Sequence, residues 1–194
     1  MNDKHKHPKG AGKSSFELIN TKILADILPV EPGSVVLDLA CGRGLYSMFL
    51  SGIIGDQGLV YAVDFWQEGI GLLDQEIEAR DITNIKTLIL DVTQEIDIDD
   101  DSVDVCLVAT VLHDFEEINK AGVVLKKIHR ILKPGGCLAV VEFKKIEGPP
   151  GPPMEIRLSE GEVEKMVARY GFKRENTADM GQYNYLVTFR SRKN

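Results

Sequence analysis

The sequence predicts an α/β fold built on a parallel sheet that carries helices on both of its faces. Short apolar runs of strand length alternate along the chain with stretches of helical periodicity, which is typical of parallel strands joined by crossover helices. The segment from Phe172 onward departs from this alternation, because a strand-like stretch is followed by another at Tyr183 to Arg190 with no helix between them. We therefore expect an antiparallel hairpin at the C-terminal end of the sheet.

Composition and charge favour a cytoplasmic protein with small-molecule partners. The 194 residues suffice for one domain with its own core. The chain has 23 Lys and Arg against 30 Asp and Glu, a net charge of −7, which argues against nucleic acid as a partner. Its polar start and the lack of any apolar run near roughly 18 residues predict neither secretion nor a membrane span. Cys41, Cys106 and Cys137 form no CxxC pair, which suits a reducing compartment.

The expected elements follow one another along the chain. Residues 1–15 are basic and polar and predict a flexible tail or a cap over a ligand, which leaves 16–194 as a single domain. Apolar residues between Phe16 and Leu28 recur at steps of three and four, the pattern of a helix with one buried face. The apolar run from Ser34 to Ala40 predicts the first buried strand. Four further strand-like runs lie at Leu59 to Val63, Lys86 to Leu90, Val103 to Thr110 and Cys137 to Phe143.

Two later helices are predicted from periodicity and from their capping residues. Apolar positions from Glu116 to Leu132 gather on one side of a long helix, and Asp114 with Glu117 spells a capping box at its start. A proline-rich stretch, GPPGPP, then forms a stiff connector. Ser159 and Glu162 form a second capping pair, which marks the start of the next helix.

A glycine-containing turn after the first strand is the first candidate for ligand binding. The stretch Val36 to Ser47, VLDLACGRGLYS, places Asp38 and Ala40 at the end of a strand and Gly42 and Gly44 at the start of a helix. Glycine lets a ligand approach the backbone, and the N–H groups of a helix start attract an anionic group or a carboxylate. A dinucleotide fingerprint requires a third glycine where this chain has serine, so a tight strand-to-helix connection stays open as the alternative.

An acid follows the second strand at a distance that suits a nucleoside. Asp64 ends the stretch YAVD, 20 residues after Gly44, where a carboxylate accepts hydrogen bonds from two ribose hydroxyls. Asp64 also fits the N-cap of a helix beginning near Trp66, with Gln67 as the reciprocal partner, and the two roles are compatible. The neighbouring Phe65 is a candidate to lie against an adenine face, or else a core residue.

A second acid ends the third strand. Asp91, in LILDVT, is a candidate to accept a hydrogen bond from the exocyclic amino group of adenine, while the backbone N–H of Val92 donates to a ring nitrogen. The alternative is that Asp91 only stabilises a turn. No metal is expected. The acidic run from Glu95 to Asp104 lacks the glycine and the final glutamate of a calcium loop, and His5 and His7 have no Cys, Asp or Glu at matching spacing.

Four motifs resemble, in this order, those of class I S-adenosylmethionine-dependent methyltransferases: VLDLACGRG at Val36 to Gly44, the acids Asp64 and Asp91, and LKPGG at Leu132 to Gly136. Within that superfamily the chain is similar to the small-molecule enzymes related to ubiquinone and menaquinone biosynthesis methyltransferases. The resemblance implies a doubly wound, Rossmann-like sheet of seven strands with the last one antiparallel, and S-adenosylmethionine as the cofactor. It further implies that the turn from Ala40 holds the methionine part, Asp64 the ribose and Asp91 the adenine. The family usually has glycine at the position of Ala40.

Candidate catalytic residues lie at the ends of the fourth and fifth strands, because open parallel sheets bind ligands beyond the carboxyl ends of their strands. His113 is the candidate proton acceptor, with packing beside the cofactor as the alternative. Glu142 either contacts the acceptor or pairs with Lys144. Arg157 either binds an anionic group of the acceptor or ties its loop down by a salt bridge, and we expect the second.

Three functions are compatible with these motifs. The main hypothesis is the transfer of a methyl group from S-adenosylmethionine to a small organic acceptor by in-line displacement, which depends mainly on positioning and on the exclusion of water. A nicotinamide-dependent oxidoreductase would use the same glycine turn and acid, but it leaves LKPGG and the terminal hairpin unexplained. The third is a non-catalytic S-adenosylmethionine-binding module that regulates a partner.

Overall fold

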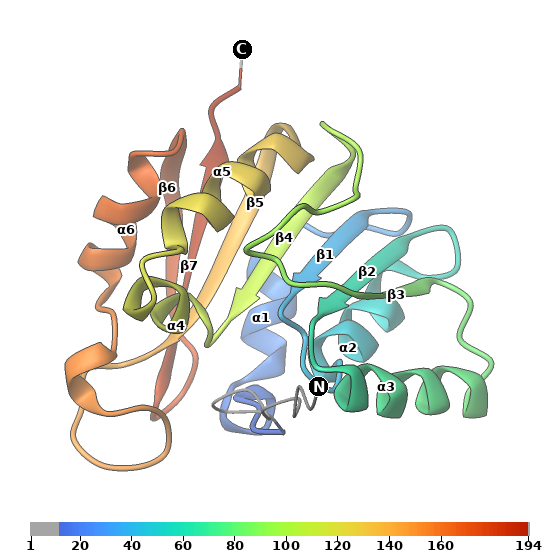
Figure 1. The fold of residues 1–194 in the computed structure, drawn as a ribbon, viewed down its shortest axis with the longest axis horizontal. Coiled ribbons are helices and arrows are strands. Elements are labelled where there is room, and N and C mark those ends of the chain that lie inside the picture. Colours follow the sequence, from blue (N-terminus) through green and yellow to red (C-terminus); the bar gives the residue numbers. More distant parts are fainter. Residues whose placement is uncertain (1–11, 194) are drawn as a thin grey trace, which may run out of the picture.

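The computed structural model describes residues 12–193, which form one seven-stranded sheet flanked by helices (Figure 1). Residues 1–11 and Asn194 lie outside the described residues, and so does most of the predicted tail or cap at 1–15. The strand order across the sheet is β3-β2-β1-β4-β5-β7-β6. The strands are β1 (Val35–Leu39), β2 (Leu59–Asp64), β3 (Ile85–Ile89), β4 (Val103–Ala109), β5 (Leu132–Phe143), β6 (Phe172–Asp179) and β7 (Asn184–Ser191).

The sheet is mostly parallel, and its direction of winding changes at its centre. Strands β1 to β5 run parallel to one another, whereas β7 runs antiparallel to both β5 and β6. From β1 the chain first builds outward through β2 and β3 and then returns to β4 on the other side of β1. The predicted doubly wound sheet of seven strands with an antiparallel C-terminal strand is therefore confirmed, and the switch between β1 and β4 is where such sheets bind ligands.

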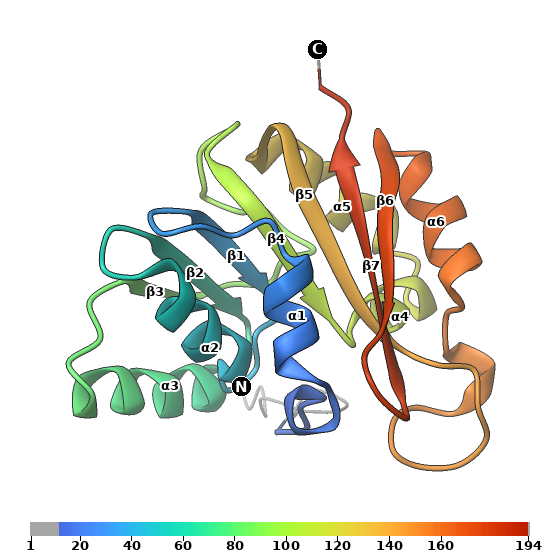
Figure 2. The ribbon, with the colours of Figure 1, turned by 180° about the vertical axis from the view of Figure 1, so that it is seen from behind.

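Helices cover both faces of the sheet (Figures 1 and 2). One face carries α1 (Thr21–Ile27) and α2 (Leu45–Ile54), and the other carries α4 (Leu112–Glu117), α5 (Ala121–Ile131) and α6 (Glu160–Ala168). Helix α3 (Gln67–Ala79) packs along β2 and β3, and two short 3-10 helices are η1 (Phe16–Leu18) and η2 (Met154–Ile156). None of the described helices has the length and apolar character needed to cross a membrane.

The central strands are apolar on both sides because helices cover both faces. Val36 of β1 pairs with Val105 of β4, and both belong to the buried cluster under α1 and α2. Their neighbours Leu37 and Cys106 belong to the cluster under α4 and α5. Since successive side chains of a strand point to opposite faces, one continuous apolar run contributes to both cores.

The helix predicted over 16–28 is wrong in one respect, because the chain breaks it into η1 and α1. The break lies at Asn20, whose side chain caps α1 by accepting hydrogen bonds from the backbone N–H groups of Lys22 and Ile23 at 3.1 and 3.3 Å. The backbone N–H of Asn20 donates instead to the carbonyl of Met180, in the turn between β6 and β7, at 2.8 Å. A contact across the molecule thus interrupts a locally continuous helical pattern.

The long helix predicted over 116–132 is also wrong, because two helices occupy this region. Helix α4 begins earlier, at Leu112, and ends at Glu117; Asn119 then takes the left-handed conformation with φ +57°, and Leu132 already belongs to β5. The capping box predicted for Asp114 is wrong too, because Asp114 lies inside the first turn of α4. The capping box predicted for Ser159 and Glu162 at the start of α6 is confirmed.

Candidate functional site

The candidate site lies at the edge where the parallel strands end. The end of β2 pairs with the end of β3, with Asp64 beside Ile89, and the N–H of Leu90 donates to the carbonyl of Asp64 at 3.0 Å. Asp64 and Asp91 are therefore brought close to one another although they are far apart in the sequence. The loops after β1 and β4 emerge at the same edge, since these strands lie parallel and adjacent.

The loop between β1 and α2 is shaped by three residues in the left-handed conformation. Ala40, Gly42 and Gly44 have φ values of +60°, +58° and +71°. Glycine adopts this conformation freely, whereas alanine pays roughly 1–2 kcal/mol for it. The chain therefore keeps the loop path at Ala40 despite the strain, and the glycine usual in the family at this position would adopt the same path without it.

The glycine loop fits a ligand on one side and packs tightly on the other. A Cβ built on Gly42 would meet no atom within 4 Å, so the backbone there borders open space. A Cβ built on Gly44 would collide with the side chain of Leu73 of α3, and one on Gly69 would lie 2.8 Å from the carbonyl oxygen of Gly42. Helix α3 thus presses against the loop from behind and leaves the face at Gly42 free for a bound group.

Asp64 connects the loop after β1 to the loop after β2. Its carboxylate oxygens accept hydrogen bonds from the backbone N–H groups of Gly42 at 2.8 Å and Trp66 at 2.7 Å. A carboxylate has about four acceptor positions, so two remain for a ligand. Asp64 is not the N-cap of α3, since that position belongs to Trp66. Asp64 is only 7 % exposed.

The remaining predicted cofactor residues border the same edge. Asp91 is exposed and accepts from the N–H of Thr93 at 2.8 Å, the pattern of a turn residue, which leaves its second carboxylate oxygen available. Val92 is buried, and its carbonyl accepts from Lys127. Phe65 is 53 % exposed, so it is no core residue, and its ring has an open face for an aromatic partner.

Asp38 lies beneath the glycine loop and holds α2 against β1. Its carboxylate accepts a hydrogen bond from the hydroxyl of Ser47 at 2.6 Å. Burial raises the pKa of Asp38 from 3.8 to about 7; the Ser47 hydrogen bond opposes this shift and the nearby charge of Asp64 adds to it. Ser47 occupies the position of the third glycine in a dinucleotide fingerprint. The hydrogen bond from Ser47 to Asp38 therefore lies where that fingerprint requires close packing of the helix on the strand.

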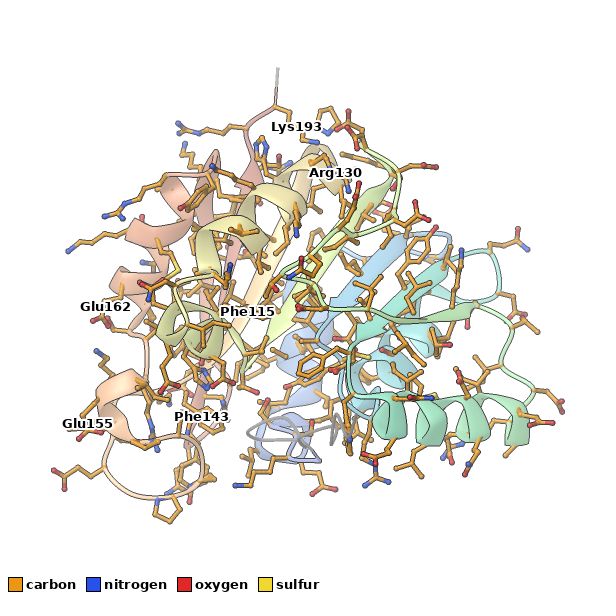
Figure 3. The ribbon with its side chains drawn as sticks, in the orientation of Figure 1. Phe115, Arg130, Phe143, Glu155, Glu162 and Lys193 are labelled. Atoms are coloured by element: carbon orange, nitrogen blue, oxygen red, sulfur yellow. The ribbon has the colours of Figure 1, made fainter. Side chains whose placement is uncertain are left out.

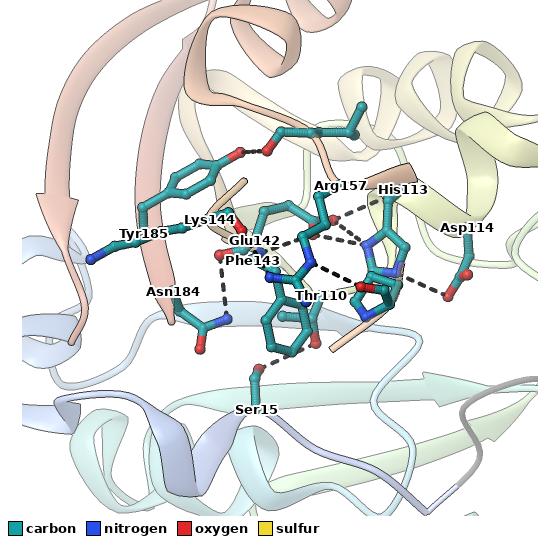
Figure 4. A network of polar contacts seen from close by, with 12 residues as sticks. Ser15, Thr110, His113, Asp114, Glu142, Phe143, Lys144, Arg157, Asn184 and Tyr185 are labelled. Carbon is teal, nitrogen blue, oxygen red and sulfur yellow. Dashed lines mark hydrogen bonds and ion pairs between the residues drawn. The ribbon is translucent and has the colours of Figure 1, made fainter. Parts of the chain in front are cut away.

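His113 and Glu142 form a buried pair (Figure 4). Glu142 lies near the end of β5 as expected, whereas His113 lies in the first turn of α4 and not at the end of β4. The Nδ1 atom of His113 lies 2.8 and 3.0 Å from the two carboxylate oxygens of Glu142, which also accepts from the backbone N–H of His113 at 3.2 Å. The Nε2 atom lies 3.6 Å from a carboxylate oxygen of Asp114. His113 is 4 % exposed and Glu142 fully buried, so the carboxylate fixes the orientation of the ring.

The charges around His113 hold its proton more tightly than water would. Burial of the ring, the largest single influence, lowers the pKa of His113. The hydrogen bond that the ring donates to Glu142 and the negative charges of Glu142, Asp114 and Glu117 outweigh burial and raise the pKa above the ordinary 6.5. The pKa of the His113 ring therefore lies above that of a free histidine.

Neither the salt bridge considered for Lys144 nor the one expected for Arg157 forms among residues 12–193. Lys144 does not pair with Glu142; its ammonium group binds Asp179 at 2.8 Å and the carbonyl of Gly181 at 2.6 Å. Arg157 ties its loop down, as expected, but it does so through backbone carbonyls and not through a carboxylate.

Three hydroxyl groups that the sequence reasoning missed join the start of the described chain to the site. The hydroxyls of Ser15 and Tyr46 share a hydrogen bond of 2.8 Å, and those of Ser15 and Thr110 share one of 3.2 Å. Thr110 directly follows β4 with φ +52°, a strained conformation for a β-branched residue that is typical of functional sites. Its place at the end of a central strand was a usable signal, whereas nothing local pointed to Ser15.

The sheet order, the glycine loop and the two acids define the class of S-adenosylmethionine-dependent methyltransferases with a Rossmann-like fold. The chain belongs to the ubiE/COQ5 methyltransferase family, whose model matches residues 16–155. The resemblance inferred from the motifs is therefore confirmed, and S-adenosylmethionine is the cofactor that this family assignment implies.

Individual relatives agree with this assignment. A demethylmenaquinone methyltransferase from Bacillus mycoides (strain KBAB4) is 30% identical over 116 residues, which are 60% of this chain and 47% of the relative. The chain thus spans about half the length of the curated relatives it matches. The crystal structure of a SAM-dependent methyltransferase from Aquifex aeolicus superposes with a TM-score of 0.82 at 27% identity and covers 91% of this chain and 92% of that one. The [4+2]-cyclase SpnF, at 16% identity and a TM-score of 0.74 over 89% and 79% of the two chains, shares the fold.

The raised pKa of His113 predicts how the stability of the pair depends on pH. A group whose pKa is higher in the folded protein stabilises the fold fully below its unfolded pKa, near 6.5, and loses that contribution as the pH rises through the folded pKa. We compare the parent protein with the double variant His113→Gln/Glu142→Gln, which leaves no buried charge alone. The stability advantage of the parent, measured by urea unfolding, should be largest below about pH 6.5 and should fall as the pH rises through the raised pKa of His113. An advantage that stays constant or grows would contradict the raised pKa.

Proposed function

We propose that this protein transfers a methyl group from S-adenosylmethionine to a small organic acceptor. One observation carries the proposal: the open face of Gly42 lies beside Asp64, which binds the backbone of Gly42 and keeps acceptor capacity for a ligand. The family match and the Aquifex aeolicus structure support the choice of cofactor. We further propose that residues 16–194 act as a single domain, because β6 and β7, beyond the family match, complete the same sheet.

The cofactor half of the site consists of backbone groups and carboxylates. We assign the loop from Ala40 to Gly44, supported by Asp38, to the methionine part, because the N–H groups at the start of α2 favour a carboxylate. Asp64 is assigned to the ribose hydroxyls. Asp91 and the N–H of Val92 are assigned to the adenine, with Phe65 against its ring face.

The acceptor half lies at the ends of β4 and β5, next to His113 and Glu142. When bound, S-adenosylmethionine supplies an electrophilic methyl group on a positively charged sulfur. Transfer of that methyl group to an acceptor that carries a proton would require a nearby group to remove the proton. Nε2 of His113 takes up that proton, while Glu142 holds Nδ1 and stabilises the cation that results. The remaining catalysis comes from positioning and from the exclusion of water.

Two other functions receive less support. A nicotinamide-dependent oxidoreductase is disfavoured by the family match and by Ser47, which fills the third glycine position and binds Asp38. A regulatory module without turnover would bind the same cofactor, and the shared fold of the cyclase SpnF is a reminder that the fold alone does not decide the reaction. Release of S-adenosylhomocysteine in the presence of an acceptor separates these possibilities.

The assignment of Asp64 to the ribose predicts a loss of cofactor affinity when this carboxylate is removed. Replacing Asp64→Asn removes one anionic acceptor and should weaken S-adenosylhomocysteine binding by about 10- to 100-fold, as expected for the loss of one or two hydrogen bonds to a charged group. Titration calorimetry measures the affinity, and the exposed Asp56→Asn serves as the control that changes the same charge elsewhere. Equal affinities in the parent and in Asp64→Asn would reject the ribose assignment, and tighter binding of NADH would favour the oxidoreductase.

The assignment of His113 as the proton acceptor predicts how the rate depends on pH. With a short-chain demethylmenaquinone, chemically reduced, as the probe, the rate of S-adenosylhomocysteine release should rise with pH through the raised pKa of His113, because only the neutral imidazole accepts a proton. His113→Gln should lower the rate by about 10²- to 10⁴-fold and abolish this part of the pH profile. The exposed Asp56→Asn, in the loop between α2 and β2, again serves as the control. An unchanged profile in His113→Gln would show that His113 only packs beside the cofactor.

A further inference from the structure

Arg157 stands out because its charge is buried inside a cage of backbone carbonyls. The residue is 2 % exposed, and its guanidinium group donates to five carbonyl oxygens of the preceding loop. The Nε atom donates to Pro152 at 2.9 Å, Nη1 to Lys144 and Ile146 at 3.1 and 2.8 Å, and Nη2 to Gly148 and Pro150 at 2.7 and 3.0 Å. A guanidinium has five N–H donors, so every donor of Arg157 has a partner.

The composition of the loop explains why it needs such a residue. The stretch GPPGPP carries four prolines, which have no N–H group and cannot hydrogen-bond to the loop's own carbonyls. Arg157 donates hydrogen bonds to the carbonyl of every second residue from Lys144 to Pro152. Within residues 12–193 no ion pair includes Arg157, so the carbonyls are the main compensation for the burial of its charge.

The loop held by Arg157, residues 144–156 (the caged loop), lies against the acceptor half of the site. It leaves β5 directly after Glu142 and Phe143, and the guanidinium of Arg157 lies 5.6 Å from the centre of the Phe143 ring. A Cβ built on Gly151 would approach that ring to 2.7 Å, so the loop folds back over Phe143. Its last turn, η2, contacts α4, the helix that carries His113. Phe143 and Glu155 lie at the end of the molecule opposite to Arg130 and Lys193 (Figure 3).

We propose that Arg157 is a positioning residue that holds the loop 144–156 in one conformation as the wall of the acceptor pocket. Arg157 lies beside the His113–Glu142 pair (Figure 4), and η2 contacts the helix that carries His113, so the wall acts on the acceptor rather than on the cofactor. The inference rests on the proposed function, because an acceptor site is needed for the wall to matter. Fixing the loop would remove its freedom before the acceptor binds, and misplacement by about 1 Å can cost about 100-fold in rate.

The test separates order in the loop from binding of the cofactor. In Arg157→Met the carbonyls lose their donors, so a glutamate-specific protease should cut at the exposed Glu147 and Glu155 at least about tenfold faster than in the parent. Affinity for S-adenosylhomocysteine should stay within about twofold, whereas the KM for reduced short-chain demethylmenaquinone should rise about tenfold or more. Arg169→Met, which removes an exposed arginine after α6, serves as the matched control and should change none of these values.

Chemical rescue keeps the test decisive if the methionine variant folds poorly. In Arg157→Ala, added guanidinium ion at non-denaturing concentration should slow the cleavage and lower the KM, whereas methylammonium, with its different donor geometry, should do neither. Unchanged cleavage in both variants, or a loss of S-adenosylhomocysteine affinity as large as the rise in KM, would overturn the proposal. If the parent does not methylate the probe although cleavage follows the expected pattern, the acceptor chosen under the proposed function fails and the caged loop stands.

Discussion

The contact between the carboxylate of Asp64 and the backbone of Gly42 organises the candidate cofactor site. It joins the loop after β1 to the loop after β2, and the second oxygen of the same carboxylate binds Trp66 at the start of α3. Helix α3 in turn packs against the glycine loop through Leu73 and Gly69. One side chain therefore fixes the path of two loops and the position of one helix. Two loops held in this way need no rearrangement before a ligand binds, which lowers the cost of binding.

The rim of the sheet divides into two halves that are built from different chemistry. The half at β1, β2 and β3 presents backbone groups, the buried carboxylate of Asp64 and the exposed carboxylate of Asp91. The half at β4 and β5 contains a buried ion-forming pair, His113 and Glu142, and a loop held by the buried charge of Arg157. Between them, the hydroxyls of Ser15, Tyr46 and Thr110 fasten the start of the described chain across the rim. This division suits a reaction in which one partner is shared by a whole family and the other differs between its members.

Much of the fold could be predicted from the sequence because the central strands are buried on both faces. Strands such as β1 and β4 then become unbroken apolar runs, and the alternation with helices indicates their parallel order. The helix breaks were missed for different reasons. Asn20 ends a helical pattern through a contact with Met180 across the molecule, which no local pattern reveals. Asn119, by contrast, is a residue type that tolerates the left-handed conformation, so a break there was readable.

The candidate site could be predicted as far as it depends on strand ends. Asp64 and Asp91 were located because each follows a strand directly, and parallel strands bring their ends together. The partners of Glu142 and Arg157 could not be found in this way, since they depend on how α4 packs against β5 and on the path of the connecting loop. For Arg157 an overlooked signal was the loop's four prolines, which leave carbonyls without local donors.

The most direct test of the account is a crystal structure of the full chain with S-adenosylhomocysteine. We expect the ribose hydroxyls within hydrogen-bond distance of the Asp64 carboxylate, the adenine beside Asp91 and the Val92 N–H, and the amino-acid end over Gly42. Density for the compound elsewhere, or carboxylates of Asp64 and Asp91 that point to opposite sides of it, would contradict the account.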